Sequence, residues 1–142
     1  MEQVQSLKGK IDQAVRTAEE FTKLYYDTVD KRRHCIAKLY LDNGLLTWNG
    51  NGISTSDRIQ KFYMDLPSSE HCVITLDSQP ILDAAVNGQL TFLIQVSGTV
   101  KYQDKLPKTF QQNFVITAQG DKWKIVNDCF RLQEPLNASD KN

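Results

Sequence analysis

The hydrophobic positions in the first part of the chain recur with the spacing of an amphipathic helix. Between residues 9 and 31, apolar side chains lie three or four positions apart, and charged side chains fill the positions between them. This spacing predicts a helix over residues 9–31, and a shorter apolar pattern predicts a second helix over 32–41. We expect a turn at Asp42-Asn43-Gly44 and an apolar strand over residues 45–48.

Short local signals between residues 49 and 67 predict a tight turn and a third helix. The segment Asn49-Gly50-Asn51-Gly52 has the composition of a turn. Ser54 is followed three residues later by Asp57, which resembles a capping box at a helix start. Apolar residues at helical spacing come next, and Pro67 is expected to end this helix.

The second half of the chain switches to the alternation of β-strands. Apolar residues occupy the even positions of 89–102, while the odd positions are mostly polar. Residues 109–118 and 122–132 predict two more strands, joined by a turn at Gly120-Asp121. Helices followed by long strands indicate an α+β fold in which the helices pack on one face of a sheet.

The opposite face of that sheet is expected to be almost free of charge. Its residues are predicted to be Gln89, Thr91, Leu93, Gln95 and Ser97; Gln111, Asn113, Val115 and Thr117; and Ile125, Asn127, Cys129 and Arg131. Arg131 is the one charged residue among them. Depletion of charge marks the centre of protein interfaces. A polar sheet face that simply meets water is the alternative to an interface. The candidate interface residues are the central members of this set, namely Leu93, Gln95, Ser97, Gln111, Asn113, Val115, Asn127, Cys129 and Arg131.

Length and charge limit the classes of function. The chain has 142 residues, and its 17 basic and 17 acidic residues give a formal net charge of zero. This length predicts one domain, which we place at 9–133 between flexible segments at 1–8 and 134–142. A neutral chain lacks the basic footprint of an autonomous nucleic-acid binder. The run Lys31-Arg32-Arg33 is expected to be a solvated face, with contact to nucleic acid or an acidic partner as the alternative.

The cysteines and the apolar runs bear on the cellular compartment. The three cysteines form no CxxC pair, which favours a reducing, intracellular setting with buried thiols. No apolar run approaches the roughly 18 residues of a membrane span, so we expect no membrane partner.

The chemical inventory gives little support for catalysis. His34 and His71 lie in no motif that pairs them with a carboxylate, and we expect both to be exposed. Asp128 has the parity of Val126, Phe130 and Leu132, which predicts a buried carboxylate that needs donors. It is either a structural acceptor for backbone or indole N–H groups or a cavity base. The spacing of Cys and His fits no metal site, and no phosphate loop is present, so we predict no cofactor, no metal and no catalytic residue.

Several short motifs, in order along residues 10–133, resemble the nuclear transport factor 2 family. They are Phe21-Thr22-Lys23-Leu24-Tyr25-Tyr26, Asp30 with Arg32-Arg33, Leu46-Thr47-Trp48-Asn49-Gly50, Asp77-Ser78-Gln79-Pro80, Phe110-Gln111-Gln112-Asn113-Phe114 and Asp128-Cys129-Phe130-Arg131. Within this family the chain is similar to the branch that supplies the small subunits of mRNA-export receptors.

The resemblance implies a fold and a set of partners. The fold would be α+β, with a cone-like curved antiparallel sheet and three helices in its concave face. The chain would pair, sheet face to sheet face, with the homologous domain of a large nuclear export factor subunit. The heterodimer would dock on phenylalanine-glycine nucleoporins, contact RNA mainly through the large subunit, and shuttle between nucleus and cytoplasm.

The sequence departs from the homodimeric importer branch of the family. That branch binds the GDP form of the small GTPase Ran through carboxylates, and here Asn49, Gln103 and Lys105 stand at the matching places. Ran-GDP binding is therefore doubtful for this chain. Two alternatives stay open, namely a homodimeric Ran-GDP carrier and a small-molecule enzyme or binder whose cavity is lined by Trp48, Tyr63 and Asp128.

Overall fold

The computed structural model describes residues 7–82 and 89–133. Their elements, in chain order, are α1 (Leu7–Lys31), η2 (Arg33–Leu39, a 3-10 helix), β1 (Tyr40–Trp48), β2 (Asn51–Ser54), α2 (Ser56–Met64), β3 (Ser69–Pro80), β4 (Thr91–Tyr102), β5 (Lys108–Gln119) and β6 (Lys122–Leu132). The predicted flexible tail at 134–142, and all but the last two residues of the predicted N-terminal segment, lie outside the described residues.

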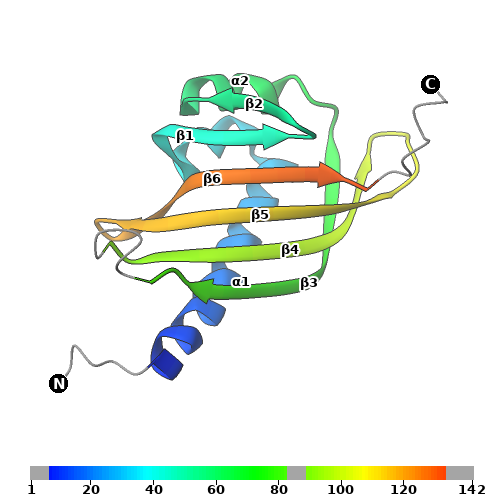
Figure 1. The fold of residues 1–142 in the computed structure, drawn as a ribbon. Coiled ribbons are helices and arrows are strands. Elements are labelled where there is room, and N and C mark those ends of the chain that lie inside the picture. The colour runs from blue at the N-terminus through cyan, green and yellow to red at the C-terminus, as the bar shows by residue number, and fades with distance from the viewer. Residues whose placement is uncertain (1–6, 83–88, 134–142) are drawn as a thin grey trace.

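The strands form one sheet in the order β2-β1-β6-β5-β4-β3, and α1 runs across one face of it (Figure 1). The predicted α+β fold, with a curved sheet and three helices, is confirmed for the described residues. One detail of that prediction is wrong, because β1 pairs with β6 in the parallel direction while every other pair is antiparallel.

Two local predictions between residues 42 and 57 also need correction. Asp42-Asn43-Gly44 is not a turn but part of β1, where the register against β6 shifts between Tyr40 and Leu45. The cap of α2 is Thr55 rather than Ser54, and its side chain accepts a hydrogen bond from the backbone N–H of Arg58 at 3.5 Å. The tight turn is confirmed at Asn49 and Gly50, whose φ angles of 48° and 89° match a two-residue hairpin.

The core lies between α1 and the inner face of the sheet. The buried face of α1 includes Ala14, Ala18, Phe21 and Tyr25, and the even positions of β4 meet it. Phe92 and Ile94 are fully buried, as the alternation predicted. Burial of a side chain of this size contributes about 1.5–3 kcal/mol, so this layer dominates the stability of the fold.

β3 and β4 bend sharply near one end of the sheet (Figure 1). Ile74 is an extra residue in β3, because Val73 pairs with Gly98 while Thr75 pairs with Ser97. A bulge of this kind bends its strand, and glycine permits the close approach of the neighbouring backbone. The bend brings the first residues of β3 against the C-terminal end of α1.

Replacing Gly98 with alanine is expected to destabilise the fold by about 1–3 kcal/mol, the usual range for overpacking. A Cβ atom at this position would overlap the Cys72 carbonyl oxygen and lie 3.1 Å from the Cα of Val73, and both are backbone atoms. Chemical denaturation measures the change. Gly52→Ala is the control, because a Cβ there would meet only the Leu45 side chain at 3.9 Å. Equal stability of the two variants would contradict the prediction.

Candidate functional site

The face of the sheet opposite α1, called the outer face here, carries the predicted interface residues in rows that cross the strands. One row runs through Leu45, Asn127, Val115 and Leu93, and the next through Thr47, Cys129, Asn113, Gln95 and Asp77. A third row contains Arg131, Gln111, Ser97 and Thr75. All the residues proposed from the sequence as interface candidates therefore lie together on one continuous surface.

Three residues that the alternation also assigned to this face are buried instead. Ile125 is fully buried, because Val126 is an extra residue in β6 and reverses the alternation before it. Val126, expected to point inward, is half-buried. Thr91 and Thr117 pair across β4 and β5, and their hydroxyl groups lie 3.2 Å apart. They also donate hydrogen bonds to the carbonyl oxygens of Gln89 and Leu90, which accounts for their burial.

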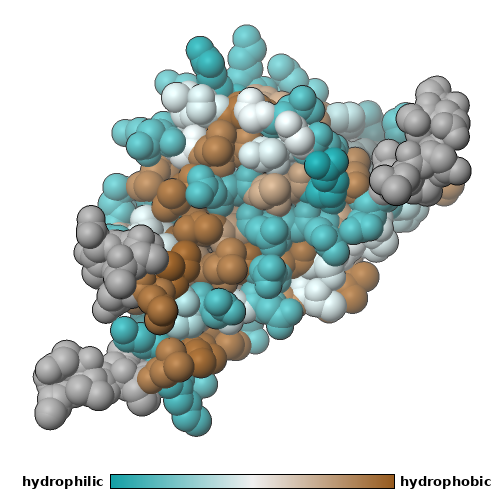
Figure 2. Space-filling view, in the orientation of Figure 1, coloured by the Kyte–Doolittle hydropathy of each residue, from teal (hydrophilic) through white to brown (hydrophobic). Residues whose placement is uncertain are grey.

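Hydrophobic side chains occupy one half of the outer face (Figure 2). Leu45 is 40% exposed, and Leu93 and Val115 are half-buried beside it. The half that contains the end of β6 is polar (Figure 2). The row Leu45, Asn127, Val115 and Leu93 is called the apolar row here, because three of its four side chains are apolar; it is partly exposed and lies beside uncharged polar groups. This is the composition of an interface centre with an adjoining polar region.

Charge on the outer face is confined to its margins, apart from Arg131. Glu70 and Asp77 lie on β3, and Lys101 lies opposite Glu70 on β4. Arg131 on β6 is three strands away from β3, roughly 14 Å at the usual strand spacing. Within the described residues its guanidinium forms no ion pair, and it lies beside Gly50.

The cysteines are more exposed than expected. All three are free thiols; Cys72 and Cys129 are exposed, and Cys35 is half-buried. The expectation of buried thiols is wrong because Cys72 and Cys129 both lie on the outer face, where Cys72 pairs with Thr99 and Cys129 with Asn113.

Asp128 is buried as predicted, and its carboxylate sits in a network of side-chain donors. Tyr40 and Tyr25 donate to Oδ2 at 2.5 and 3.0 Å, and Gln112 Nε2 donates to Oδ1 at 2.7 Å. The hydroxyl of Tyr63 lies 2.5 Å from that of Tyr25. The donors are thus tyrosine hydroxyls and an amide, not the backbone or indole groups that we expected.

Burial controls the electrostatics of this network. It raises the pKa of Asp128 to about 6, although the hydrogen bonds from Gln112, Tyr40 and Tyr25 oppose the rise. Burial, reinforced by the charge of Asp128, raises the pKa of Tyr25 and Tyr40 well above 10. Tyr25, Tyr40 and Tyr63 are almost completely buried, so these rings occupy the space around the carboxylate that a cavity ligand would need.

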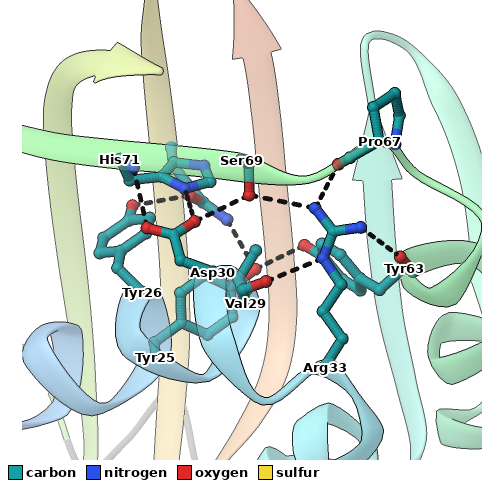
Figure 3. A network of polar contacts seen from close by, with 10 residues as sticks. Tyr25, Tyr26, Val29, Asp30, Arg33, Tyr63, Pro67, Ser69 and His71 are labelled. Atoms are coloured by element: carbon teal, nitrogen blue, oxygen red, sulfur yellow. Dashed lines mark hydrogen bonds and ion pairs between the residues drawn. The ribbon is translucent and has the colours of Figure 1, made fainter. Parts of the chain in front are cut away.

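A second polar network fixes the C-terminal end of α1 to the start of β3 (Figure 3). Asp30 Oδ1 accepts from His71 Nδ1 at 2.7 Å and from Ser69 Oγ at 2.8 Å, and Oδ2 accepts from the His71 backbone N–H at 2.8 Å. Burial acts to raise the pKa of Asp30, but the hydrogen bonds and charge of His71 and the bond from Ser69 outweigh it and hold that pKa below 3.8.

The sequence suggested an exposed His71, but its side chain is only 4% exposed and pairs with a carboxylate. His34 is exposed as expected. Asp30 and His71 are 41 residues apart, and no local spacing connects them. The sequence feature that could have indicated this pair is Asp30, an acid at the predicted C-terminal end of a helix. A negative charge is unfavourable there unless a partner compensates it.

The basic run 31–33 is divided between one arginine held within the molecule and two exposed cations. Arg33 donates to the carbonyl oxygens of Val29, Tyr63, Leu66 and Pro67 and to Ser69 Oγ (Figure 3). Lys31 and Arg32 pair with Asp27 at 3.7 and 3.2 Å. Arg33 thus ties the end of α2 to α1 and is not part of a solvated face. Lys31 and Arg32 are exposed, as expected for a solvated face.

Residues 7–82 and 89–133 contain neither a membrane-spanning helix nor a cluster of metal-ligating side chains. No helix in these ranges is long and apolar enough to cross a membrane. No group of three or more His, Cys, Asp or Glu side chains there could hold a metal ion.

Comparisons with known sequences identify the family. The model of the nuclear transport factor 2 (NTF2) domain matches residues 17–132. NTF2-related export protein 2 of Homo sapiens is 47% identical over 131 residues, which cover 89% of this chain and 92% of the relative. An NTF2-related export protein of Caenorhabditis elegans is 30% identical over 133 residues, with 92% and 96% covered.

Solved structures share the fold. Nuclear transport factor 2 of Cryptosporidium parvum has a TM-score of 0.75 at 26% identity, and the match covers 90% of this chain and 98% of that one. A chain of the Mtr2–Mex67 M domain complex of C. albicans has a TM-score of 0.71 at 15% identity, with 88% and 99% covered. From the domain match and these relatives together, the chain belongs to the nuclear transport factor 2 family, in which it is similar to the NTF2-related export proteins.

Proposed function

We propose that this chain is the small, non-enzymatic subunit of an mRNA-export receptor, and that its outer face binds the homologous domain of a large nuclear export factor subunit. The observation that carries this proposal is the charge-depleted centre of the outer face. It holds the partly exposed apolar row and, among the residues that the structure describes, one cation without an ion pair, Arg131. Interfaces are depleted of charge at their centre, whereas a sheet face that meets water usually carries charged residues.

The comparisons support the same proposal. The curated relatives that cover most of this chain are named export proteins. At the level of the fold, a chain of this architecture has been solved in the Mtr2–Mex67 M domain complex. An architecture that occurs in one such complex is a suitable scaffold for the pairing proposed here.

The mechanism follows from binding to the folded state. A subunit that covers an apolar sheet face of its partner stabilises the partner by mass action. The assembled receptor would then dock on phenylalanine-glycine nucleoporins, shuttle between nucleus and cytoplasm, and contact RNA mainly through the large subunit, because this chain is neutral. Catalysis has no place in this mechanism, since the rings of Tyr25, Tyr40 and Tyr63 enclose the buried carboxylate of Asp128.

Leu93→Asp is expected to weaken the heterodimer by about 2 kcal/mol or more, because an unpaired carboxylate would enter the apolar row. The measurement is co-elution of the variant with the large subunit's homologous domain in size exclusion, over a dilution series. Leu106→Asp is the control, because Leu106 is 84% exposed and lies between β4 and β5, off the outer face.

Two outcomes would contradict the proposal. Equal co-elution of the two variants would show that the outer face is not the contact surface. A stable homodimer of the unmodified chain that binds Ran-GDP, detected by light scattering and a pull-down, would favour the importer-like alternative. Identification of the stoichiometric partner after affinity purification from native cells tests the identity of the large subunit separately.

A further inference from the structure

A groove on the helix side of the molecule has an apolar floor. It encloses about 450 Å³ between the middle of α1, the end of η2 and the start of β6. Phe21 and Leu24 come from α1, Leu39 from η2 and Trp123 from β6. α1 lies on the face of the sheet opposite the outer face (Figure 1). The groove therefore borders the helix side of the sheet, beside the start of β6.

The floor of the groove is already in place without a ligand. Phe21 is 5% exposed and meets Phe114 edge to face, with ring centroids 5.9 Å apart. Trp123 stacks on Phe92 at 4.9 Å. Leu24 is 43% exposed on the wall and offers free apolar surface. A preformed apolar pocket loses little conformational entropy when a side chain enters it.

The rim of the groove is basic. Lys38, Lys122 and Lys124 line it, and Glu20 is the acid among the lining residues. Lys124 Nζ donates to the carbonyl oxygen of Lys38 at 2.6 Å. Within the described residues, none of the three lysines forms an ion pair. In a chain of zero net charge, this is a local excess of positive charge beside an apolar pocket.

We propose that this groove binds an acidic protein segment that inserts one large apolar side chain, aromatic or aliphatic, and places its carboxylates against Lys38, Lys122 and Lys124. The apolar floor supplies the affinity for the anchor, and the basic rim selects segments with flanking acids. A single-stranded nucleic acid fits less well, because it needs aromatic faces for base stacking. One face of Trp123 is covered by Phe92, and Phe21 is almost completely buried.

Fluorescence polarisation with labelled peptides and the full chain tests the proposal. The probe is a short peptide with one phenylalanine flanked by aspartate and glutamate. One control peptide has the acids replaced by asparagine and glutamine, and another has phenylalanine replaced by serine. We expect binding of the probe alone, with each control at least about tenfold weaker. Labelled oligouridylate tests the nucleic-acid alternative.

Two protein variants locate the binding site. Leu24→Asp and Lys122→Glu are each expected to weaken the probe at least about tenfold, because one removes apolar surface and the other reverses a rim charge. Leu7→Asp is the matched control, since Leu7 is 61% exposed on α1 and outside the groove. Circular dichroism melting confirms that the variants are folded.

The following results would overturn the proposal: no binding of the acidic probe, equal binding of the uncharged peptide, or equal binding by Lys122→Glu. Tighter binding of oligouridylate, with the same sensitivity to Lys122→Glu, would instead assign the groove to nucleic acid. The proposal does not depend on the heterodimer, because loss of partner binding in Leu93→Asp should leave peptide binding unchanged.

Discussion

Arg131→Asp is expected to abolish assembly of this chain with the large export factor subunit. Arg131 is exposed in the third row of the outer face, and within the described residues no carboxylate pairs with it. A guanidinium that becomes desolvated in an interface requires a carboxylate, which would have to come from the partner. Removing one member of such a pair costs about 3–5 kcal/mol, or several hundred-fold or more in affinity. Charge reversal should cost more, because two carboxylates would face each other.

Co-expression with the large subunit, followed by size exclusion at low concentration, measures this effect. Arg58→Asp is the matched control, because Arg58 is also exposed but belongs to α2, away from the outer face. Recovery of the complex by an Asp→Arg change in the partner would identify the paired carboxylate. Stoichiometric co-elution of Arg131→Asp would show that Arg131 lies at the rim, where an ion pair contributes well under about 1 kcal/mol.

Asp128→Asn is expected to change how stability depends on pH. Folding raises the pKa of this carboxyl from 3.8 to about 6, mainly by burial. The folded protein therefore binds a proton between these pH values that the unfolded chain has lost. The stability contributed by Asp128 is complete below pH 3.8 and is lost as the pH rises through about 6. The full difference is about 3 kcal/mol, from the usual conversion of a pKa change into free energy.

Denaturant unfolding of wild type and variant across pH 3.5 to 7.5 measures this linkage. Relative to Asp128→Asn, the wild type should lose about 3 kcal/mol of stability over that interval. Asp30→Asn is a control of opposite sign, because folding lowers the pKa of Asp30. Relative to that variant, the wild type should gain stability as the pH rises through the acidic range. Parallel pH profiles for wild type and Asp128→Asn would contradict the prediction.

The sequence pattern was sufficient for most of the fold and for the outer face. Side chains alternate between the two faces of a strand. In a stretch without a bulge, all odd-numbered residues therefore share one face and all even-numbered residues the other. Asn127, Cys129 and Arg131 were placed correctly for this reason. The extra residue Val126 reverses the parity, and Ile125 was consequently assigned to the wrong face. A β-bulge cannot be recognised reliably from the amino-acid sequence. Residues beyond a bulge are therefore assigned to the wrong face of the sheet.

The long-range polar networks could not be predicted. The burial of Asp128 followed from parity, but its donors come from α1, β1 and β5, and only the tertiary fold brings Tyr25, Tyr40 and Gln112 together. The pairing of Asp30 with His71 depends on the bend at Ile74, which turns the start of β3 towards α1. A hydropathy pattern predicts which side chains are buried. It does not predict which residues from distant segments become neighbours in the folded chain.

The two borders of the sheet determine how copies of this protein can aggregate. β2 has four residues, and β3 is interrupted by the bulge at Ile74, carries Asp77 and ends at Pro80. Short length, a bulge, a charge and a proline each discourage a further strand from adding by backbone hydrogen bonding. Growth of a continuous intermolecular sheet, the route to fibrils, is thereby blocked at both borders. Association therefore depends on side-chain contacts, which select a partner by shape and charge. Backbone hydrogen bonds at a free sheet edge would not discriminate between strands.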